Sequence, residues 1–162
     1  AESRFASDPH WRELVVLKTT DSEFHTFYSD RYTTLVPTDD RIMASSVTAQ
    51  WLHTDADVDW GTSYDAVLAA LTDTFAGHYS LALQQTLYAM GEAVIDGQPE
   101  IGEVRFSMPN KHHFLVDLSP YGVENKNEVF HADDRPYGFI EGTIHNDDAP
   151  APGLAFDPGQ GW

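Results

Sequence analysis

The chain of 162 residues contains no cysteine. This absence excludes disulfides, thiolate nucleophiles and cysteine-ligated zinc or iron–sulfur sites. The chain also has no apolar run long enough to cross a bilayer, no charged-then-apolar leader, and no C-terminal address of the Ser-Lys-Leu type. We therefore expect a soluble protein of the reducing cytoplasm.

Basic residues are scarce. Three Lys and six Arg stand against 26 acidic residues, and the formal net charge is −17. Such a surface repels polyanions, so we expect neither nucleic acid nor a membrane as a partner. An Asp-rich, Lys-poor composition is also typical of halophilic proteins, in which salt screens self-repulsion. An ordinary soluble acidic protein is the alternative.

Several catalytic signatures are missing as well. The sequence has no Gly-rich phosphate loop, no Gly-x-Ser-x-Gly elbow and no His-Glu-x-x-His helix. The adjacent His112 and His113 would point to opposite sides of a strand, and no third ligand accompanies them at useful spacing. We therefore expect no metal site.

Hydrophobic periodicity predicts one α+β domain. Strands are expected at 11–19, 41–53, 103–108, 112–118 and 138–145, with a loop over 119–137. Two helices are expected between the second and third strands, the first capped by Thr62 and Asp65, the second by Ser80. This order favours an antiparallel sheet with both helices on one face.

The composition also suggests boundaries. Residues 1–10 are polar and small and are interpreted as an N-terminal arm or linker. The domain is expected over 11–145. Residues 146–162 are rich in Asp, Pro, Ala and Gly and are predicted to form a mobile tail.

The most informative stretch is the polar cluster from Ser107 to Phe114, which lies between two apolar runs. Pro109 cannot donate to a sheet, so a strand must end or bend there. In an extended segment, Asn110 and His112 would share one face. The alternative is a hairpin corner with His112 packed beside Phe114 and Val116 on the core face.

Three further features could bind a flat polar ligand. Arg41 could grip a carbonyl and a ring nitrogen together, or form an ion pair with a nearby aspartate. Gln84 lies at a predicted helix start, where free amides favour an anion, although a solvated surface Gln is common there. One ring of the insertion that includes Phe24 could stack on a ligand, although most such rings belong to cores.

Together these segments resemble the C-terminal half of the urate oxidase (uricase) family. The resemblance rests on these stretches in family order: Leu14 to Thr20, Ser22 to Phe24, Tyr32 to Leu35, Asp40 to Ile42, Ser80 to Tyr88, Met108 to His112, Glu128 to Phe130, and Pro136 to Gly138. The insertion before Arg41 and the Pro-Asn-Lys-His corner are specific when they occur together.

The resemblance implies a tunnelling fold (T-fold), in which subunits assemble into a barrel, here expected to be a homotetramer. It also implies cofactor-free oxidation of urate by dioxygen to 5-hydroxyisourate and hydrogen peroxide. By position, Phe24 would stack on urate, and Arg41, the Leu83 amide and the Gln84 side chain would grip its edges. As implied catalytic residues, Asn110 would hold dioxygen or water, and His112 would belong to a proton relay.

The family's catalytic Lys and its Thr partner lie in an N-terminal half that this sequence does not include, and Lys18-Thr19 does not match that motif. The resemblance therefore implies that this chain is one piece of a uricase that is truncated, nicked or encoded as two chains, with an N-terminal uricase half as the partner that supplies Lys and Thr. A non-catalytic purine- or pterin-binding or assembly module is the alternative. A relative acting on pterins or guanosine triphosphate is disfavoured, because such enzymes typically need a zinc site.

Overall fold

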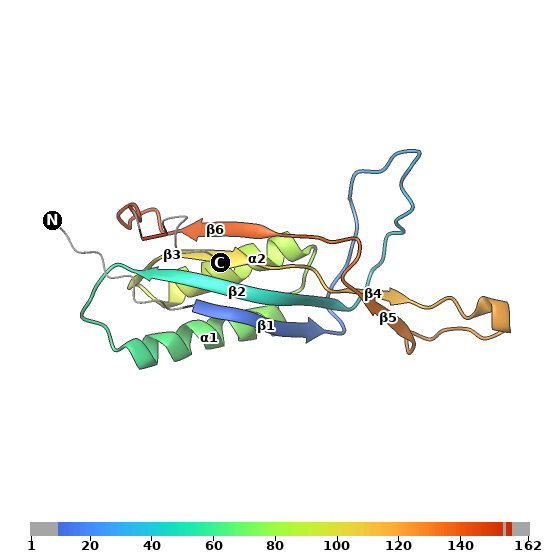
Figure 1. Cartoon of the computed structure of the whole chain (residues 1–162), viewed down its shortest axis with the longest axis horizontal. Helices are drawn as coiled ribbons and strands as arrows, with labels where there is room; N and C mark the ends of the chain where they lie inside the picture. Colours follow the sequence, from blue (N-terminus) through green and yellow to red (C-terminus); the bar gives the residue numbers. More distant parts are fainter. Residues whose placement is uncertain (1–9, 154, 157–162) are drawn as a thin grey trace.

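A computed structural model describes residues 10–153 and 155–156 of the chain. The elements are β1 (His10–Lys18), β2 (Met43–His53), α1 (Trp60–Gly77), α2 (Leu83–Gly97), β3 (Ile101–Ser107), β4 (His112–Leu115), η1 (Ser119–Tyr121), β5 (Phe130–Asp133) and β6 (Glu141–His145). The predicted α+β class, with two helices on an antiparallel sheet, is confirmed (Figure 1).

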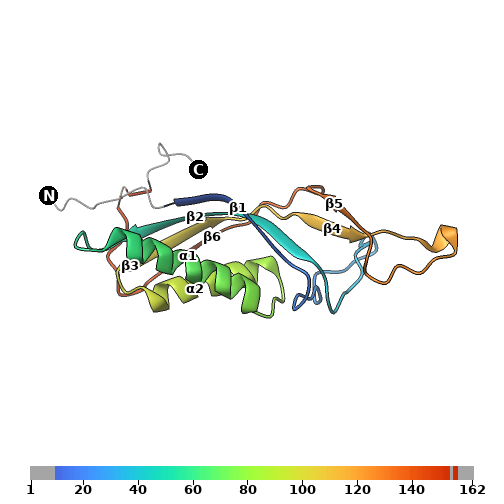
Figure 2. The ribbon, with the colours of Figure 1, turned by 90° about the horizontal axis from the view of Figure 1, so that it is seen from below.

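The main sheet has four strands in the order β1-β2-β3-β6, and every neighbouring pair is antiparallel. Strands β1 and β2 pair with an irregular register between Trp11 and Leu14. Both helices cover one face of this sheet, as the view from below shows (Figure 2).

The core lies between the helices and the sheet, and its largest buried side chains include Phe106, Leu71 and Met90. Helix α2 passes close to β6 because two glycines leave room for neighbouring side chains. A Cβ on Gly91 would lie 2.6 Å from the Ile144 side chain, and one on Gly142 would lie 2.6 Å from Leu87. The close packing fixes α2, and therefore its first turn, against the sheet.

Both predicted helix caps were wrong. Helix α1 is capped by Asp59, whose Oδ1 accepts a hydrogen bond from the Thr62 amide at 3.2 Å, so Thr62 and Asp65 already lie inside the helix. Helix α2 begins at Leu83 after Ala82, which offers no side-chain cap. Ser80 is extended instead, because its backbone pairs with the segment around Ser22.

The fourth predicted strand does not join the main sheet. Strand β4 pairs only with β5 to form a separate two-stranded sheet, and β5 lies inside the predicted loop 119–137. The pair extends beyond one end of the main sheet, as does the long connection between β1 and β2 (Figure 1). Pro109 lies at the bend where β3 gives way to β4.

The predicted arm, residues 1–10, lies outside the described residues except for His10, which begins β1. In the predicted tail, the Asn146 amide donates to the Gly102 carbonyl at 2.9 Å. The Arg105 guanidinium carbon lies 4.0 Å from the centroid of the Phe156 ring. The proposed boundaries at 11 and 145 stay a prediction.

Candidate functional site

The connection after β1 brings Phe24 beside the segment that leads into β2. The Phe24 amide donates to the Thr38 carbonyl at 2.8 Å, and the Thr38 amide donates back at 3.1 Å. Three residues after Thr38, the Arg41 amide donates to the Ser22 carbonyl at 2.8 Å. These bonds hold Phe24 and Arg41 on adjoining extended segments.

The side chains of these two residues are in contact. The guanidinium carbon of Arg41 lies 4.8 Å from the centroid of the Phe24 ring, and Phe27 stacks on the same ring at 4.7 Å. The sequence predicted neither contact, but it singled out both Phe24 and Arg41. The Phe24 ring thus lies in contact with both a planar cation and a second aromatic ring.

Arg41 is a partly buried cation without a carboxylate partner among the described residues. The alternative of an ion pair with a nearby aspartate is wrong, because Arg41 forms no ion pair within the described residues; Asp39 instead bonds His25 at 2.8 Å, and Asp40 accepts from Thr20 at 3.2 Å. The Arg41 Nε is buried and has no hydrogen-bond partner. Desolvation lowers the pKa of Arg41, so the group would gain from an anion that pairs with it.

The start of α2 lies against the same extended segment. Ser22 and Ser80 form a parallel bridge in which the Ser80 amide donates to the Asp21 carbonyl at 2.8 Å and the Glu23 amide donates to the Ser80 carbonyl at 2.9 Å. Leu83 is buried, whereas Gln84 is exposed. As the first residue of α2, Leu83 has a backbone amide with no acceptor inside the helix.

The polar corner runs alongside the beginning of β2. The Lys111 amide donates to the Ala44 carbonyl at 3.0 Å, and the Asn110 amide donates to the Gly138 carbonyl at 2.8 Å. Ser45 Oγ donates to the Pro109 carbonyl at 3.0 Å. Asn110, in the connection between β3 and β4, forms an isolated antiparallel bridge with Ser45 of β2, which begins two residues after Arg41.

Asn110 and His112 lie together, as the alternation of side chains predicted. Asn110 Nδ2 is 3.4 Å from His112 Nδ1, and His112 Nε2 is 2.8 Å from the Pro136 carbonyl oxygen. The imidazole stacks on Phe114 at 5.4 Å, but Phe114 is 42% exposed, so the alternative of packing on a core face is wrong. His113 turns away, with Nδ1 3.2 Å from the Lys111 carbonyl oxygen.

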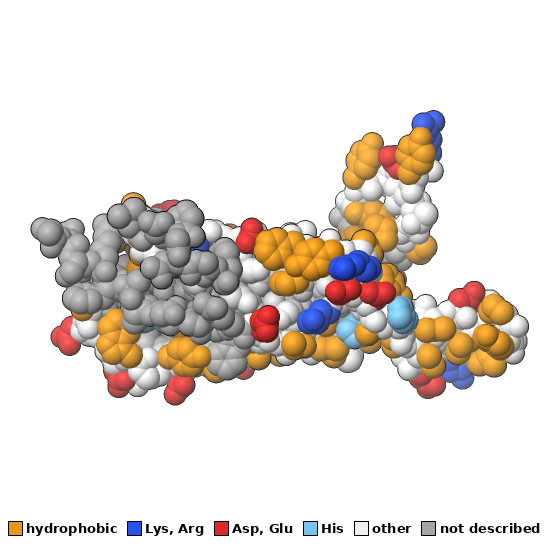
Figure 3. Space-filling model, viewed as in Figure 1, with side chains coloured by type: hydrophobic (Ala, Val, Ile, Leu, Met, Phe, Trp, Pro, Cys, Tyr) orange, Lys and Arg blue, Asp and Glu red, His pale blue; other side chains and the backbone are white. Residues whose placement is uncertain are grey.

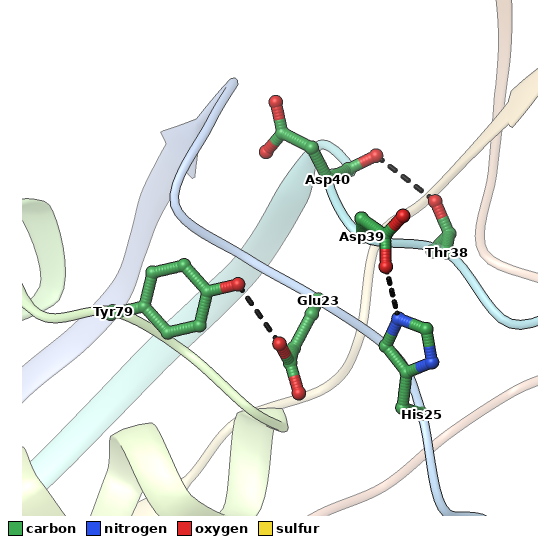
Figure 4. A network of polar contacts seen from close by, with 6 residues as sticks. All are labelled: Glu23, His25, Thr38, Asp39, Asp40 and Tyr79. Carbon is green, nitrogen blue, oxygen red and sulfur yellow. Dashed lines mark hydrogen bonds and ion pairs between the residues drawn. The ribbon is translucent and has the colours of Figure 1, made fainter.

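A carboxylate-rich set of polar contacts involves Glu23 and His25, the sequence neighbours of Phe24, and the sequence analysis missed it (Figure 4). Tyr79, in the connection between the helices, donates its hydroxyl to Glu23 at 2.9 Å. This bond, with the nearby carboxylates, raises the pKa of Tyr79. On the other side of Phe24, His25 bonds Asp39. Short exposed polar residues in a loop gave no periodic signal from which these pairs could have been found.

Neither helix of the described part of the chain has the length and hydropathy that crossing a bilayer requires. Within residues 10–153 and 155–156, no group of three or more His, Cys, Asp or Glu side chains could hold a metal ion.

Comparison with known proteins identifies the family. The uricase family model matches residues 11–141. The chain belongs to the uricase family. The sequence is 55% identical over 138 residues to the uricase of Arthrobacter globiformis, and the match covers 85% of this chain and 46% of that protein. It is 39% identical over 132 residues to the uricase of Dictyostelium discoideum, covering 82% and 46% respectively.

Solved uricase structures have the same fold. The crystal structure of the Arthrobacter globiformis uricase superposes with a TM-score of 0.83 at 54% identity, covering 86% of this chain and 49% of that one. A uricase from Bacillus fastidious superposes with a TM-score of 0.68 at 22% identity, covering 84% and 43%, which shows the fold alone. The predicted T-fold is therefore confirmed, and the chain spans about half the length of the relatives it matches.

Proposed function

We propose that this chain supplies the urate-binding half of a urate oxidase site. The supporting observation is the contact of Arg41 with Phe24, because a partly buried cation, with no carboxylate partner in the described part of the chain, lies against an aromatic ring. A planar purine anion would stack on Phe24 while its edge pairs with the Arg41 fork. The Leu83 amide and the Gln84 side chain would take the lactam edge.

The reaction is the oxidation of urate by dioxygen and water to 5-hydroxyisourate and hydrogen peroxide. Triplet dioxygen reacts slowly with closed-shell organic molecules, so the site must make urate electron-rich. Charge-assisted hydrogen bonds from Arg41 would favour the urate anion, and removal of a further proton would yield the dianion. Two electrons then pass from the dianion to dioxygen, and water adds to the oxidised ring.

Two residues of the corner take roles in this step. Asn110 would hold dioxygen, and then water, above the ring, and His112 would pass protons. The catalytic Lys and Thr are expected from an N-terminal uricase half, and the assembled protein is expected to be a homotetrameric barrel. These roles rest on the family resemblance and on the proximity of Asn110 to His112.

Reconstitution tests the proposal. This chain is expressed alone and together with the N-terminal half of the Arthrobacter globiformis uricase, and urate absorbance and hydrogen peroxide are followed. The chain alone should be inactive, and the complex, called the assembled enzyme below, should consume urate and release peroxide. A complex that binds urate but never oxidises it would favour the alternative, a non-catalytic purine- or pterin-binding or assembly module.

Substitutions then separate binding from turnover. In the assembled enzyme, Arg41→Ala should raise KM for urate by about 10- to 100-fold, because a charge-assisted hydrogen bond is lost. Asn110→Ala should mainly lower kcat. Arg31→Ala is the matched control, since Arg31 stacks on Tyr32 in the exposed connection before β2. A KM for Arg41→Ala equal to that of the parent would contradict the binding role.

A further inference from the structure

A buried pair of hydroxyl groups lies below the first turn of α2, and the proposed reaction does not use it. Ser80 and Thr86 are both completely buried. Thr86 Oγ1 lies 2.7 Å from Ser80 Oγ and 3.1 Å from the Ala82 carbonyl oxygen. Each hydroxyl can both donate and accept, so the pair and this carbonyl form a short connected chain of hydrogen bonds.

The backbone of Ser80 connects this pair to the segment that carries Phe24. Its amide and carbonyl bond to Asp21 and Glu23, on either side of Ser22. The Ser22 carbonyl in turn accepts from the Arg41 amide. Ser80 is therefore joined through the segment from Asp21 to Glu23 to both members of the ring-and-cation contact.

The start of α2 has few other polar contacts that could set its position. Ala82, which precedes the helix, provides no side-chain cap, and the Leu81 amide is bonded by Gln85 from within the same turn. Thr86 is the residue through which the first turn of α2 reaches Ser80. Leu83 and Leu87 also pack into the core and hold the helix against the sheet, and the 2.7 Å hydrogen bond adds a directional link from its first turn to Ser80.

We propose that the Ser80–Thr86 pair positions the amide end of the ligand site, formed by Leu83 and Gln84, against the Phe24 and Arg41 end. This inference rests on the proposed function, because it assumes that one ligand spans both ends. Two sets of groups that bind one rigid ring must keep a fixed separation. A displacement of one set by about 1 Å is enough to weaken binding strongly. Ser80 and Thr86 are positioning residues and touch no substrate.

The test compares three variants of the assembled enzyme. Thr86→Val keeps the shape but removes the hydroxyl, Thr86→Ser keeps the hydroxyl, and Thr72→Val removes the hydroxyl that donates to the Leu68 carbonyl at 2.9 Å in α1. Thr86→Val should raise KM for urate about tenfold with kcat within about twofold of the parent. Thr86→Ser and Thr72→Val should leave KM within about twofold.

A double-mutant cycle shows whether Thr86 acts through the helix start. If it does, Gln84→Ala and Thr86→Val together should raise KM by clearly less than the product of their separate effects. Independent effects would instead indicate a general loss of stability and would overturn the positioning role. A KM raised equally by Thr72→Val would overturn it as well.

A second measurement does not depend on activity. Amide hydrogen exchange over residues 81–87 should become faster in Thr86→Val than in the parent, with little change over β2 and β3. If the parent complex proves inactive, equilibrium binding of urate replaces KM. A parent that neither binds nor oxidises urate would refute the proposed function. A parent that binds urate with the same affinity as Thr86→Val, or equal exchange in both proteins, would refute only this inference.

Discussion

The helix-backed sheet and the two projecting segments, residues 25–37 and 116–129, hold their shape in different ways. In the sheet, Phe106, Val104 and Val47 are fully buried. In the projecting segments, Tyr28, Val36 and Tyr121 are 86%, 78% and 81% exposed. The described shape of the projections depends on local hydrogen bonds rather than on burial, and both extend away from the sheet (Figure 3).

The candidate site lies where these two regions meet. Phe24 and Arg41 flank the first projecting segment, and Asn110 and His112 precede the second. Backbone hydrogen bonds to Ser22 and Ala44 tie Arg41 and Lys111 to segments next to the sheet. The sheet and α2 therefore provide rigidity at the site, while the base of the first projection brings Phe24 and Arg41 together.

The largest expected effect is a cavity in the sheet. Phe106→Ala should lower the free energy of unfolding by about 3–5 kcal/mol, because a fully buried ring is removed. Tyr121→Ala, in the second projection, should change it by no more than about 0.5 kcal/mol. Urea denaturation of the purified chain measures both. A loss for Tyr121→Ala approaching that for Phe106→Ala would show that the projection is part of the folded core.

A smaller and local effect is expected at Asn125, which closes the second projection. Its Nδ2 donates to the carbonyls of Val116 and Val129 at 2.8 and 2.7 Å, and its Oδ1 accepts from the amides of Glu128 and Val129 at 3.1 and 3.2 Å. Asn125→Ala should accelerate hydrogen exchange of the Glu128 and Val129 amides about tenfold or more. The denaturation midpoint should hardly move.

Two comparisons sharpen that result. Asn125→Asp keeps the acceptor oxygen and loses both donors, so its exchange rates should fall between those of the parent and Asn125→Ala. Lys126→Ala, at an exposed neighbouring side chain, should leave exchange unchanged. A large drop in the denaturation midpoint of Asn125→Ala would show that the projection unfolds together with the sheet.

The sequence predicted the sheet and helices well because their apolar residues recur at regular spacing. It failed at β5, whose four residues alternate weakly and include none that is buried, so that pairing with β4 is what makes them a strand. Ser80 was predicted as a cap from its residue type, but tertiary pairing with Ser22 overrides that local preference.

In the candidate site, too, local geometry could be predicted from the sequence, whereas tertiary contacts could not. Asn110 and His112 could be placed together because two positions on one extended segment have a fixed geometry. The contact of Arg41 with Phe24 depends on how residues 25–37 fold back, and no periodic signal encodes that path. The Ser22–Ser80 bridge joins segments 58 residues apart, so only the assembled fold reveals it.

The smallest expected effect is on the pH dependence of stability. It distinguishes a buried histidine of the sheet from an exposed histidine of the β4–β5 pair. His53 Nε2 lies 3.0 Å from Ser63 Oγ, and Ser63 donates to Glu100 at 2.7 Å. Burial lowers the pKa of His53, and the charge of Glu100 opposes this shift in part. His131, beside Asp133 at 3.3 Å, is largely exposed.

The folded state disfavours protonation of His53, so neutral His53 contributes fully to stability above the pKa of the unfolded state, about 6.5. This contribution is lost as the pH falls through the lower pKa of the folded state. When the pH is lowered from 7.5 to 5, the unfolding midpoint of the parent should therefore decrease. The midpoint of His53→Gln should decrease less. His131→Gln should follow the parent. Glu100→Gln should make the midpoint decrease more steeply as the pH is lowered, since this substitution removes the charge that favours protonated His53. Parallel curves for the parent and His53→Gln would mean that the buried imidazole does not sense pH in this range.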